Sequence, residues 1–276
     1  MTSRWADELG FATELARRAG ALLTDSYERL ERIDYKSKRD VVTNADYASE
    51  RLVIDSIKER FPGDAILAEE SGEHAGVLRD DGSHNGRTWV IDPLDGTVNY
   101  ANGIPYYCVS IGLVVDDRPA VGVVLDPARD DCYAATADGP ALLNGEPVVA
   151  SDKEALSDFV VSLAVIGRGG LGRERRIAPL IRIHRRMGSA ALSLAYVANG
   201  RFDAFVQNGG LSPWDVAASG LIAERAGAVV TDVRGGAWWA KKVRGPRASI
   251  VAAPPSQHGA LLELLGTLKT TVQARR

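Results

Sequence analysis

The stretch from Trp89 to Tyr100, Trp-Val-Ile-Asp-Pro-Leu-Asp-Gly-Thr-Val-Asn-Tyr, constrains the fold of this chain more than any other. Its apolar start predicts a buried strand, because Trp, Val and Ile are strand-forming residues. Pro93 lacks the N–H group that a strand ladder needs, so we expect Asp92 and Asp95 to lie on the turn after the strand. Carboxylate oxygens at a strand end suit Mg²⁺ or Mn²⁺. The stretch therefore predicts a metal site.

The residues after the second aspartate add a candidate anion site. Gly96 and Thr97 can open a helix whose free N–H groups face a phosphate. A plain surface turn is the alternative, because Asp, Pro and Gly are ordinary turn residues. Thr97 and Asn99 at fixed offsets, with the apolar run from Val109 to Val115 after them, form a longer pattern than a turn requires.

The motif Asp-Pro-Leu-Asp-Gly-Thr-Val-Asn-Tyr resembles the signature of the inositol monophosphatase family of Mg²⁺-dependent, Li⁺-sensitive phosphatases. Further matches extend the resemblance from about Lys36 to Gly227. It implies a layered α+β or α/β fold, an αβαβα sandwich of the inositol monophosphatase and fructose-1,6-bisphosphatase type. It also implies in-line hydrolysis of a phosphomonoester by a metal-activated water, without a covalent intermediate.

Two further motifs complete the metal site that the resemblance implies. Ala68-Glu69-Glu70-Ser71 stands where the family has Gly-Glu-Glu-Ser, so Glu69 is expected to bind metal and Glu70 to support it. Trp214-Asp215-Val-Ala matches the family's Trp-Asp-x-Ala motif, in which the Asp binds a second metal. Without the resemblance, the glutamates would be a solvated strand end and Asp215 a helix N-terminal acid. The implied cofactor is two or three Mg²⁺ ions, or Mn²⁺, and the expected ligands are Glu69, Asp92, the Leu94 carbonyl, Asp95 and Asp215.

The family resemblance also implies a catalytic pair. Asp40-Val-Val-Thr-Asn-Ala-Asp46 resembles the family's Asp-x-Val-Thr-x-x-Asp, whose last Asp accepts a hydrogen bond from the Thr of the central motif. Asp46 and Thr97 are therefore expected to orient the nucleophilic water, and Glu69 is counted with them as catalytic. Taken alone, Asp46 would be a helix N-terminal acid.

The substrate residues are implied by the same resemblance. Gly188-Ser189-Ala190-Ala matches a stretch whose backbone meets the substrate's hydroxylated ring, although alone it would be a close-packed helix start. Asn208 stands where inositol-selective members carry Glu, which weakens the expectation of a strong preference for inositol phosphate. The expected substrate-binding residues are Gly96, Thr97, Gly188, Ser189, Ala190, Asn208 and Asp215.

The segment from Gly167 to Arg186 contains seven arginines and a single acid, Glu174. A solvated or dimer-facing helix explains this composition, and a clamp for a second phosphate is the alternative. The phosphatase substrates left open are inositol-1-phosphate, fructose-1,6-bisphosphate, histidinol phosphate and phosphoadenosine phosphate. The non-enzymatic alternative is a binding or regulatory protein with the same fold, and the convergent acids argue against it.

Several other chemistries fit the sequence poorly. Asp92 and Asp95 lack the Asp-x-Asp spacing of aspartyl-phosphate enzymes, and the sequence has neither a P-loop nor a Gly-x-Ser-x-Gly elbow. The four histidines lack zinc spacing, so we expect them on the surface. Cys108 and Cys132 sit in apolar runs and are expected to be buried free thiols.

The overall composition gives weak but consistent constraints. The 33 Lys+Arg and 36 Asp+Glu residues leave a net charge of −3, which favours neither nucleic acid nor an anionic membrane as a partner. The N-terminal region carries acids among its apolar residues, and no apolar run approaches a membrane span. We therefore expect a soluble cytoplasmic protein, and the family resemblance implies that it is a homodimer that binds a small phosphorylated metabolite.

Periodicity predicts helices and strands along the whole chain of 276 residues. A helix to about Tyr27 and a second one capped by Asn44 come first, then a strand from Ala65 and a mobile loop over 71–87. A meander over 106–140 follows, and after it strands and helices alternate, with helices across 173–197. We expect one phosphatase domain, 1–276, with subdomains 1–150 and 151–276.

Overall fold

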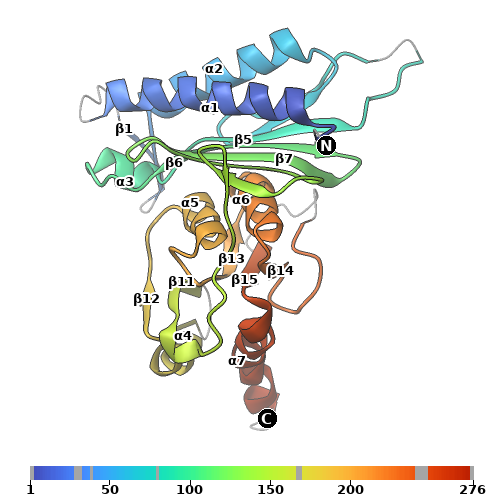
Figure 1. The fold of residues 1–276 in the computed structure, drawn as a ribbon. Helices are drawn as coiled ribbons and strands as arrows, with labels where there is room; N and C mark the ends of the chain where they lie inside the picture. Colours follow the sequence, from blue (N-terminus) through green and yellow to red (C-terminus); the bar gives the residue numbers. More distant parts are fainter. Residues whose placement is uncertain are drawn as a thin grey trace.

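The protein forms five stacked layers in the order helices, sheet, helices, sheet, helices. The computed structural model describes residues 3–27, 33–37, 40–78, 81–165, 170–239 and 248–273. Figure 1 shows α1 and α2 at the top, the first sheet beneath them, α5 and α6 in the middle, then the second sheet, and α4 and α7 at the bottom. The expected αβαβα sandwich is confirmed.

The outer helical layer consists of α1 (Ala6–Ser26) and α2 (Asn44–Arg60). The predicted apolar stripe of α1 is buried against the first sheet. Helix α2 is capped by Thr43 and not by the expected Asn44, because the Thr43 hydroxyl accepts a hydrogen bond from the Ala45 N–H at 3.2 Å. The side chain that caps the helix therefore lies one residue earlier than predicted.

The first sheet has eight strands in the order β10-β9-β8-β7-β6-β5-β3-β4. Its strands are β3 (Ala65–Ala68), β4 (Gly72–His74), β5 (Arg87–Asp95), β6 (Cys108–Val115), β7 (Arg118–Asp126), β8 (Asp131–Thr136), β9 (Ala141–Leu143) and β10 (Glu146–Pro147). A separate ribbon pairs β1 (Ile33–Ser37) with β2 (Asp40–Thr43). The predicted antiparallel meander is confirmed as β6, β7 and β8. Strands β3 and β5 are parallel, so they end at the same edge of the sheet.

Two expectations for this sheet are wrong. Strand β5 does not stop at Pro93: Asp92 pairs with Ser110, a bulge takes the proline out of the ladder, and pairing resumes between Asp95 and Cys108. The predicted loop over 71–87 contains β4, a short polar strand on the edge next to β3, which periodicity over so few residues could not show.

The second sheet has five strands in the order β12-β11-β13-β15-β14. They are β11 (Val160–Val165), β12 (Ile183–Arg185), β13 (Ala204–Leu211), β14 (Val229–Thr231) and β15 (Ala248–Ala253). The remaining helices are α3 (Thr97–Ala101), α4 (Gly170–Ile177), α5 (Ala190–Ala195), α6 (Pro213–Arg225), α7 (Pro255–Gln273) and the short turns η1 (Leu156–Asp158), η2 (Ala178–Leu180) and η3 (Tyr196–Asn199). The helices expected across 173–197 are interrupted by β12, which pairs in parallel with β11.

Helix α6 packs directly on the first sheet. A Cβ atom at Gly122 of β7 would lie 2.6 Å from the Ala218 carbonyl oxygen, so only glycine permits this approach. The same helix contacts β14 and β15 of the second sheet, and apolar side chains fill the space around it. The start of α6 is thereby held beside the end of β5.

The two cysteines have the burial that the sequence predicts, and one of the histidines does not. Cys108 and Cys132 are buried free thiols, which confirms the prediction. His258 is only 6% exposed, so the expected surface position is wrong for this histidine. Its Nε2 atom lies 3.0 Å from the Thr231 hydroxyl, and burial lowers its pKa. No helix in the described parts of the chain is both long and apolar enough to cross a bilayer.

Candidate active site

Three carboxylates from two elements meet where strand β5 ends, beside the start of helix α6. Asp92 and Asp95 come from β5, and Asp215 comes from the first turn of α6. One oxygen atom from each of the three lies within 4.8 Å of the others. The bulge at Pro93 and the packing of α6 on the sheet bring these residues together although they lie far apart in the sequence.

Burial and repulsion between neighbouring carboxylates both act on the acids of this cluster. Burial raises the pKa of Asp92 well above its usual range, and the charges of Glu69, Asp95 and Asp215 raise it further. Burial also raises the pKa of Asp215, with Asp95 and Glu69 adding repulsion. A divalent cation would relieve this repulsion, and hard oxygen donors at this spacing are the ligands that Mg²⁺ and Mn²⁺ prefer. The residues present therefore fit a metal site.

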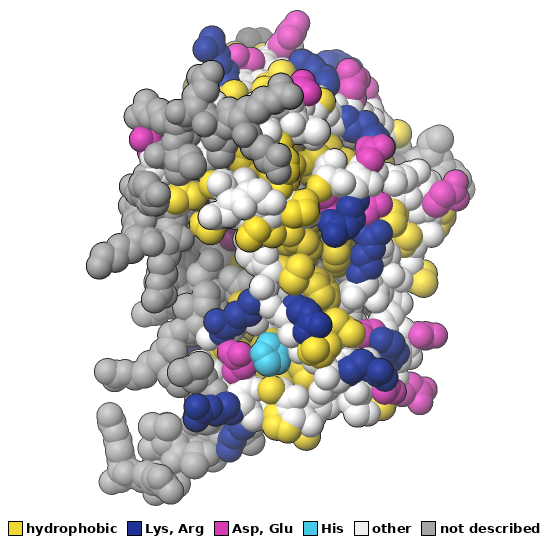
Figure 2. Space-filling model, turned by 90° about the vertical axis from the view of Figure 1, so that its left-hand side faces the viewer, with side chains coloured by type: hydrophobic (Ala, Val, Ile, Leu, Met, Phe, Trp, Pro, Cys, Tyr) yellow, Lys and Arg dark blue, Asp and Glu magenta, His cyan; other side chains and the backbone are white. Residues whose placement is uncertain are grey.

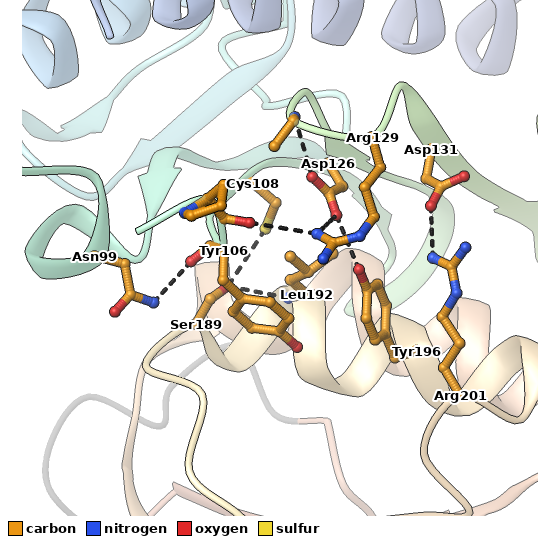
Figure 3. Close-up of polar contacts among 12 residues, drawn as sticks. Asn99, Tyr106, Cys108, Asp126, Arg129, Asp131, Ser189, Leu192, Tyr196 and Arg201 are labelled. Atoms are coloured by element: carbon orange, nitrogen blue, oxygen red, sulfur yellow. Dashed lines mark hydrogen bonds and ion pairs between the residues drawn. The ribbon is translucent and has the colours of Figure 1, made fainter. Parts of the chain in front are cut away.

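Asp95 is held by the segment that opens α5. Its Oδ2 atom accepts hydrogen bonds from the Ser189 hydroxyl and the Ala191 N–H, each at 2.6 Å. Burial raises the pKa of Asp95, and these two bonds oppose that shift. The buried Cys108 thiol lies 3.7 Å from the Ser189 hydroxyl, a contact that Figure 3 shows. Two of the residues in the expected ring-binding stretch thus contact the Asp95 carboxylate.

Asp46 and Thr97 lie in contact, as the motif pair implied. The Thr97 hydroxyl is 3.0 Å from Asp46 Oδ1 and 3.0 Å from the Leu94 carbonyl oxygen. Its single proton can be donated to only one of them at a time. Asp46 Oδ2 accepts from the Thr43 hydroxyl at 2.6 Å and the Thr43 N–H at 2.8 Å, so the carboxylate is fixed in orientation.

The turn between β5 and α3 requires Gly96. This residue has a φ of 100°, and a Cβ atom there would lie 3.0 Å from the Tyr106 carbonyl oxygen. Asn99, one turn later, donates from its Nδ2 atom to the carbonyl oxygens of Tyr106 and Met187, both at 2.7 Å. Its bond to Tyr106 is visible in Figure 3. Asn99 therefore ties α3 to the segment that leads to α5.

A second polar network holds α5 and η3 against the first sheet. The buried Asp126 carboxylate accepts from the Tyr196 hydroxyl at 2.9 Å and from the Arg129 guanidinium at 3.1 Å (Figure 3). Arg201 pairs with Asp131 beside it. These contacts fix the helix whose first residues hold Asp95.

Glu69 lies on the loop between β3 and β4. Ala68, the last residue of β3, pairs with Ile91, so Glu69 follows it next to Asp92. The Glu69 carboxyl group shares a hydrogen bond with that of Asp92, which helps to raise the Asp92 pKa. The metal-ligand residues expected from sequence are thus neighbours in space.

Glu50 is a further residue beside the site that was not predicted from the sequence. This residue of α2 is 4% exposed and accepts hydrogen bonds from the Glu70 and Ser71 N–H groups. A signal was present in the sequence, because Glu50 follows Asp46 by four residues and must share its helix face.

Two other sequence-predicted features have contacts outside this cluster. Asn208 lines a separate hollow of about 400 Å³ between β13 and α7, together with Arg173 and Arg234. In the arginine-rich segment, Arg182 pairs with Asp158, and Arg186 and His184 pair with Glu174. Arg168 lies outside the described residues. The described pairs are consistent with a solvated or interface surface.

The fold and the site together define a class, a layered αβαβα protein with a carboxylate cluster that could hold a metal ion. The model of the inositol monophosphatase family matches residues 5–270. The chain is 38% identical over 236 residues to "Nus factor SuhB" of Salmonella typhimurium, covering 83% of this chain and 86% of that protein. It is 35% identical to "Inositol monophosphatase 3" of Solanum lycopersicum, covering 82% and 86%. It shares 30% identity and a TM-score of 0.85 with the Thermotoga maritima IMPase structure, covering 96% and 99%.

The chain belongs to the inositol monophosphatase family. It is a phosphoric monoester hydrolase, and the family resemblance read from the sequence motifs is confirmed.

Proposed function

We propose that the protein is a Mg²⁺-dependent phosphomonoesterase for small polyol or sugar phosphates, with inositol-1-phosphate as its first candidate substrate. The observation that carries this proposal is the convergence of Asp92, Asp95 and Asp215 next to the hydrogen-bonded pair of Asp46 and Thr97. Relatives named inositol monophosphatase support the substrate class. Fructose-1,6-bisphosphate, histidinol phosphate and phosphoadenosine phosphate are the other candidates.

The proposed metal ligands are the carboxylates of Glu69, Asp92, Asp95 and Asp215 and the carbonyl oxygen of Leu94. Two or three Mg²⁺ ions, or Mn²⁺ in their place, would lower the pKa of a water molecule and neutralise charge on the phosphate and the leaving oxygen. Leu94 can serve as a ligand when the Thr97 proton is donated to Asp46, because its carbonyl oxygen then has free lone pairs.

Thr97 and Asp46 would position the nucleophilic water. With its proton donated to Asp46 Oδ1, the Thr97 hydroxyl keeps its lone pairs for a proton of the attacking water. This contact orients the water and favours removal of its proton. The N–H groups of Gly96 and Thr97, at the start of α3, would hold the phosphate.

The organic part of the substrate would lie against the start of α5, where Gly188 and Ala190 flank the buried Ser189, whose hydroxyl donates to Asp95. Asn208 was expected here because of its place in the motif order. An amide at this position can bond to ring hydroxyls but lacks the charge-assisted hydrogen bond of a carboxylate, so we expect broad tolerance among polyol phosphates.

A phosphate-release screen over the four substrates tests the proposal. Each reaction is run with Mg²⁺, with EDTA in place of Mg²⁺, and with Li⁺ added to the Mg²⁺ reaction. We expect Mg²⁺-dependent release that Li⁺ inhibits, with inositol-1-phosphate accepted and no substrate favoured by a hundredfold or more. Release that persists in EDTA would contradict the metal mechanism.

We propose a homodimer in the cytoplasm as the working form. Figure 2 shows a band of hydrophobic side chains, with Lys and Arg side chains beside it, on the side where α3 and β12 lie. Val98 of α3 is 45% exposed and Ile183 of β12 is 39% exposed. A second copy that covers this face would explain both the apolar band and the neighbouring arginines.

A binding or regulatory role is the non-enzymatic alternative. Relatives named "Nus factor SuhB" stand beside relatives named inositol monophosphatase, so the names themselves admit both roles. The buried carboxylates favour hydrolysis, because a binding module has no need to hold mutually repelling acids together. The phosphate-release screen separates the two roles.

A further inference from the structure

One face of α2 makes hydrogen bonds to three segments: the start of α3, the bulge in β5, and the loop between β3 and β4. Asp46 accepts from Thr97 at the start of α3, and Ser49 donates to the Pro93 carbonyl oxygen at 3.0 Å. Glu50 accepts from the loop between β3 and β4. Positions 46, 49 and 50 share a helix face because they are three and four residues apart. Only the first of these three contacts belongs to the catalytic pair.

Glu50 holds its loop through both carboxylate oxygens. Oε2 accepts from the Glu70 N–H at 2.8 Å, and Oε1 accepts from the Ser71 N–H at 2.9 Å. The next residue, Gly72, has a φ of 78° and pairs with Ala68 across the hairpin. Successive N–H groups followed by a left-handed residue form a concave anion site, and here a carboxylate of the chain itself occupies it.

This arrangement fixes the backbone on both sides of Glu69. Ala68, before it, is held in β3 by pairing with Ile91. Glu70, after it, is held by Glu50. Without the Glu50 carboxylate, two N–H groups in a partly buried loop would lose their acceptors and the loop would shift toward other partners.

We propose that Glu50 is a positioning residue for the metal site, holding the β3–β4 loop so that the Glu69 carboxylate faces Asp92. The proposal rests on the proposed function, in which Glu69 is a metal ligand. Glu50 itself bonds to the backbone and not to the substrate or the reacting atoms. Groups that orient a metal ligand in this way change metal affinity by about 10–100-fold when removed.

The test replaces Glu50 in the full-length protein with Gln, which keeps the shape but presents an NH₂ group to one of the two N–H donors. Glu59→Gln makes the same chemical change on the exposed side of α2. Val53→Ala destabilises α2 from its fully buried face and leaves the Glu50 carboxylate in place. Mg²⁺ affinity is measured without substrate by titration calorimetry and by the Mg²⁺-induced rise in Tm. The Mg²⁺ concentration for half-maximal rate and the KM at saturating Mg²⁺ are then compared.

We expect Glu50→Gln to raise the Mg²⁺ Kd about tenfold or more and to leave the KM at saturating Mg²⁺ within about twofold of wild type. Glu59→Gln should match wild type. Val53→Ala should lower the Tm of the metal-free protein and keep the wild-type Mg²⁺ Kd. A simple loss of stability would move the Tm alone, so the change in Kd identifies positioning.

A wild-type Kd for Glu50→Gln, or an equal rise for Val53→Ala, would overturn the proposal. If Glu50→Gln does not fold, Glu50→Asp keeps the charge on a shorter side chain and should raise the Kd in the same direction. Failure of both variants to fold would assign Glu50 to global stability and reject the positioning role. If the wild-type protein itself neither binds Mg²⁺ nor releases phosphate, the proposed function fails. Wild-type activity with an unaffected Glu50→Gln rejects only the inference about Glu50.

Discussion

Helices α2 and α6 begin in the same way and place their first-turn aspartates in different surroundings. In α2, Thr43 and Asp46 form a capping box, and in α6, Ser212 and Asp215 form another. Asp46 Oδ2 accepts from the Thr43 N–H at 2.8 Å, and Asp215 Oδ2 accepts from the Ser212 N–H at 2.6 Å. One local motif therefore supplies a fixed carboxylate at two places in the site.

The difference between the two aspartates lies in what faces the carboxylate. Asp46 faces the Thr97 hydroxyl, a neutral donor. Asp215 faces Asp95 and Glu69, and burial with their charges raises its pKa. The helix start fixes where each carboxylate lies, and the neighbouring elements decide whether it suits a proton relay or a cation. The comparison can be tested by removing the charge, the relay, the metal and the cap in turn.

The largest effect is expected for Asp215→Asn. The variant keeps an oxygen for the Ser212 N–H but loses the charge that would bind metal. We expect kcat/KM to fall about a thousandfold or more, because the metal contributes several kcal/mol of charge stabilisation. Steady-state rates over a Mg²⁺ titration measure this. A near wild-type rate at saturating Mg²⁺ would show that Asp215 is not a ligand.

The Asp46 side of the comparison predicts a loss of rate without a loss of metal. Thr97→Ala and Asp46→Asn should each lower kcat by about 10²–10⁴-fold, the range of general acid–base catalysis. The double variant should lose little more than either single variant, because both belong to one relay. The Mg²⁺ Kd should stay near that of wild type. Rate losses that multiply in the double variant would argue for independent roles.

Removing Mg²⁺ should act on the carboxylate cluster and depend on pH. The folded-state pKa values of Asp92 and Asp215 are raised above the unfolded value of about 3.9, so their stabilising contribution is present at low pH. It is lost as pH rises through the raised folded pKa values. Mg²⁺ binds the deprotonated groups and should therefore raise the Tm more at pH 7.5 than at pH 5.

At a Mg²⁺ concentration of one hundred times Kd, the stabilisation is about 2.7 kcal/mol, or roughly 5–10 °C in Tm. Thermal melts with Mg²⁺ and with EDTA at both pH values measure it. Asp92→Asn supplies the control, since it should raise the metal-free Tm at pH 7.5 and reduce the difference between the two pH values. An equal Mg²⁺ effect at both pH values would place the titrating groups elsewhere.

The smallest effect is expected for the caps themselves. Thr43→Ala and Ser212→Ala should each cost about 1 kcal/mol of folding free energy, as cap substitutions do. Thr43→Ala should also lower kcat, because the Thr43 hydroxyl bonds directly to Asp46 at 2.6 Å. Thermal melts and single-turnover rates on both variants give the comparison. Equal kcat in Thr43→Ala and wild type would mean that the backbone N–H of Thr43 alone orients Asp46.

The sequence predicted the elements whose pattern is local. The apolar stripe of α1 and the meander from β6 to β8 follow from periodicity, and the structure contains both. The clustering of Asp215 with Asp92 and Asp95 was implied by the family resemblance, and the structure contains it too. Strand β12 was missed because its three residues, Ile183, His184 and Arg185, are too few to show a strand period, and only pairing with β11 makes them a strand. The strand end at Pro93 was misplaced because a bulge restores pairing beyond the proline.

The residues that were missed act across the fold. Glu50 bonds to a loop about twenty positions later: its spacing from Asp46 gives the helix face it shares, but not the loop that it contacts. The expected position of His258 on the surface was wrong because the packing of α7 against β14 buries it. Asn208 was expected at the site from its place in the motif order, and in the structure it lies on β13 and lines a hollow together with Arg173.

Helix α6 packs against both sheets, so we expect metal binding at Asp215 to affect the local unfolding of the second sheet. Its Ala218 backbone rests on Gly122 of the first sheet, and its far side contacts β14 and β15. The second sheet cannot open without loosening the helix that presents Asp215. A cation bound by Asp215 would therefore slow hydrogen exchange in β14 and β15, at the opposite side of α6 from the metal. An ion bound at the first turn of α6 would in this way slow the opening of the second sheet.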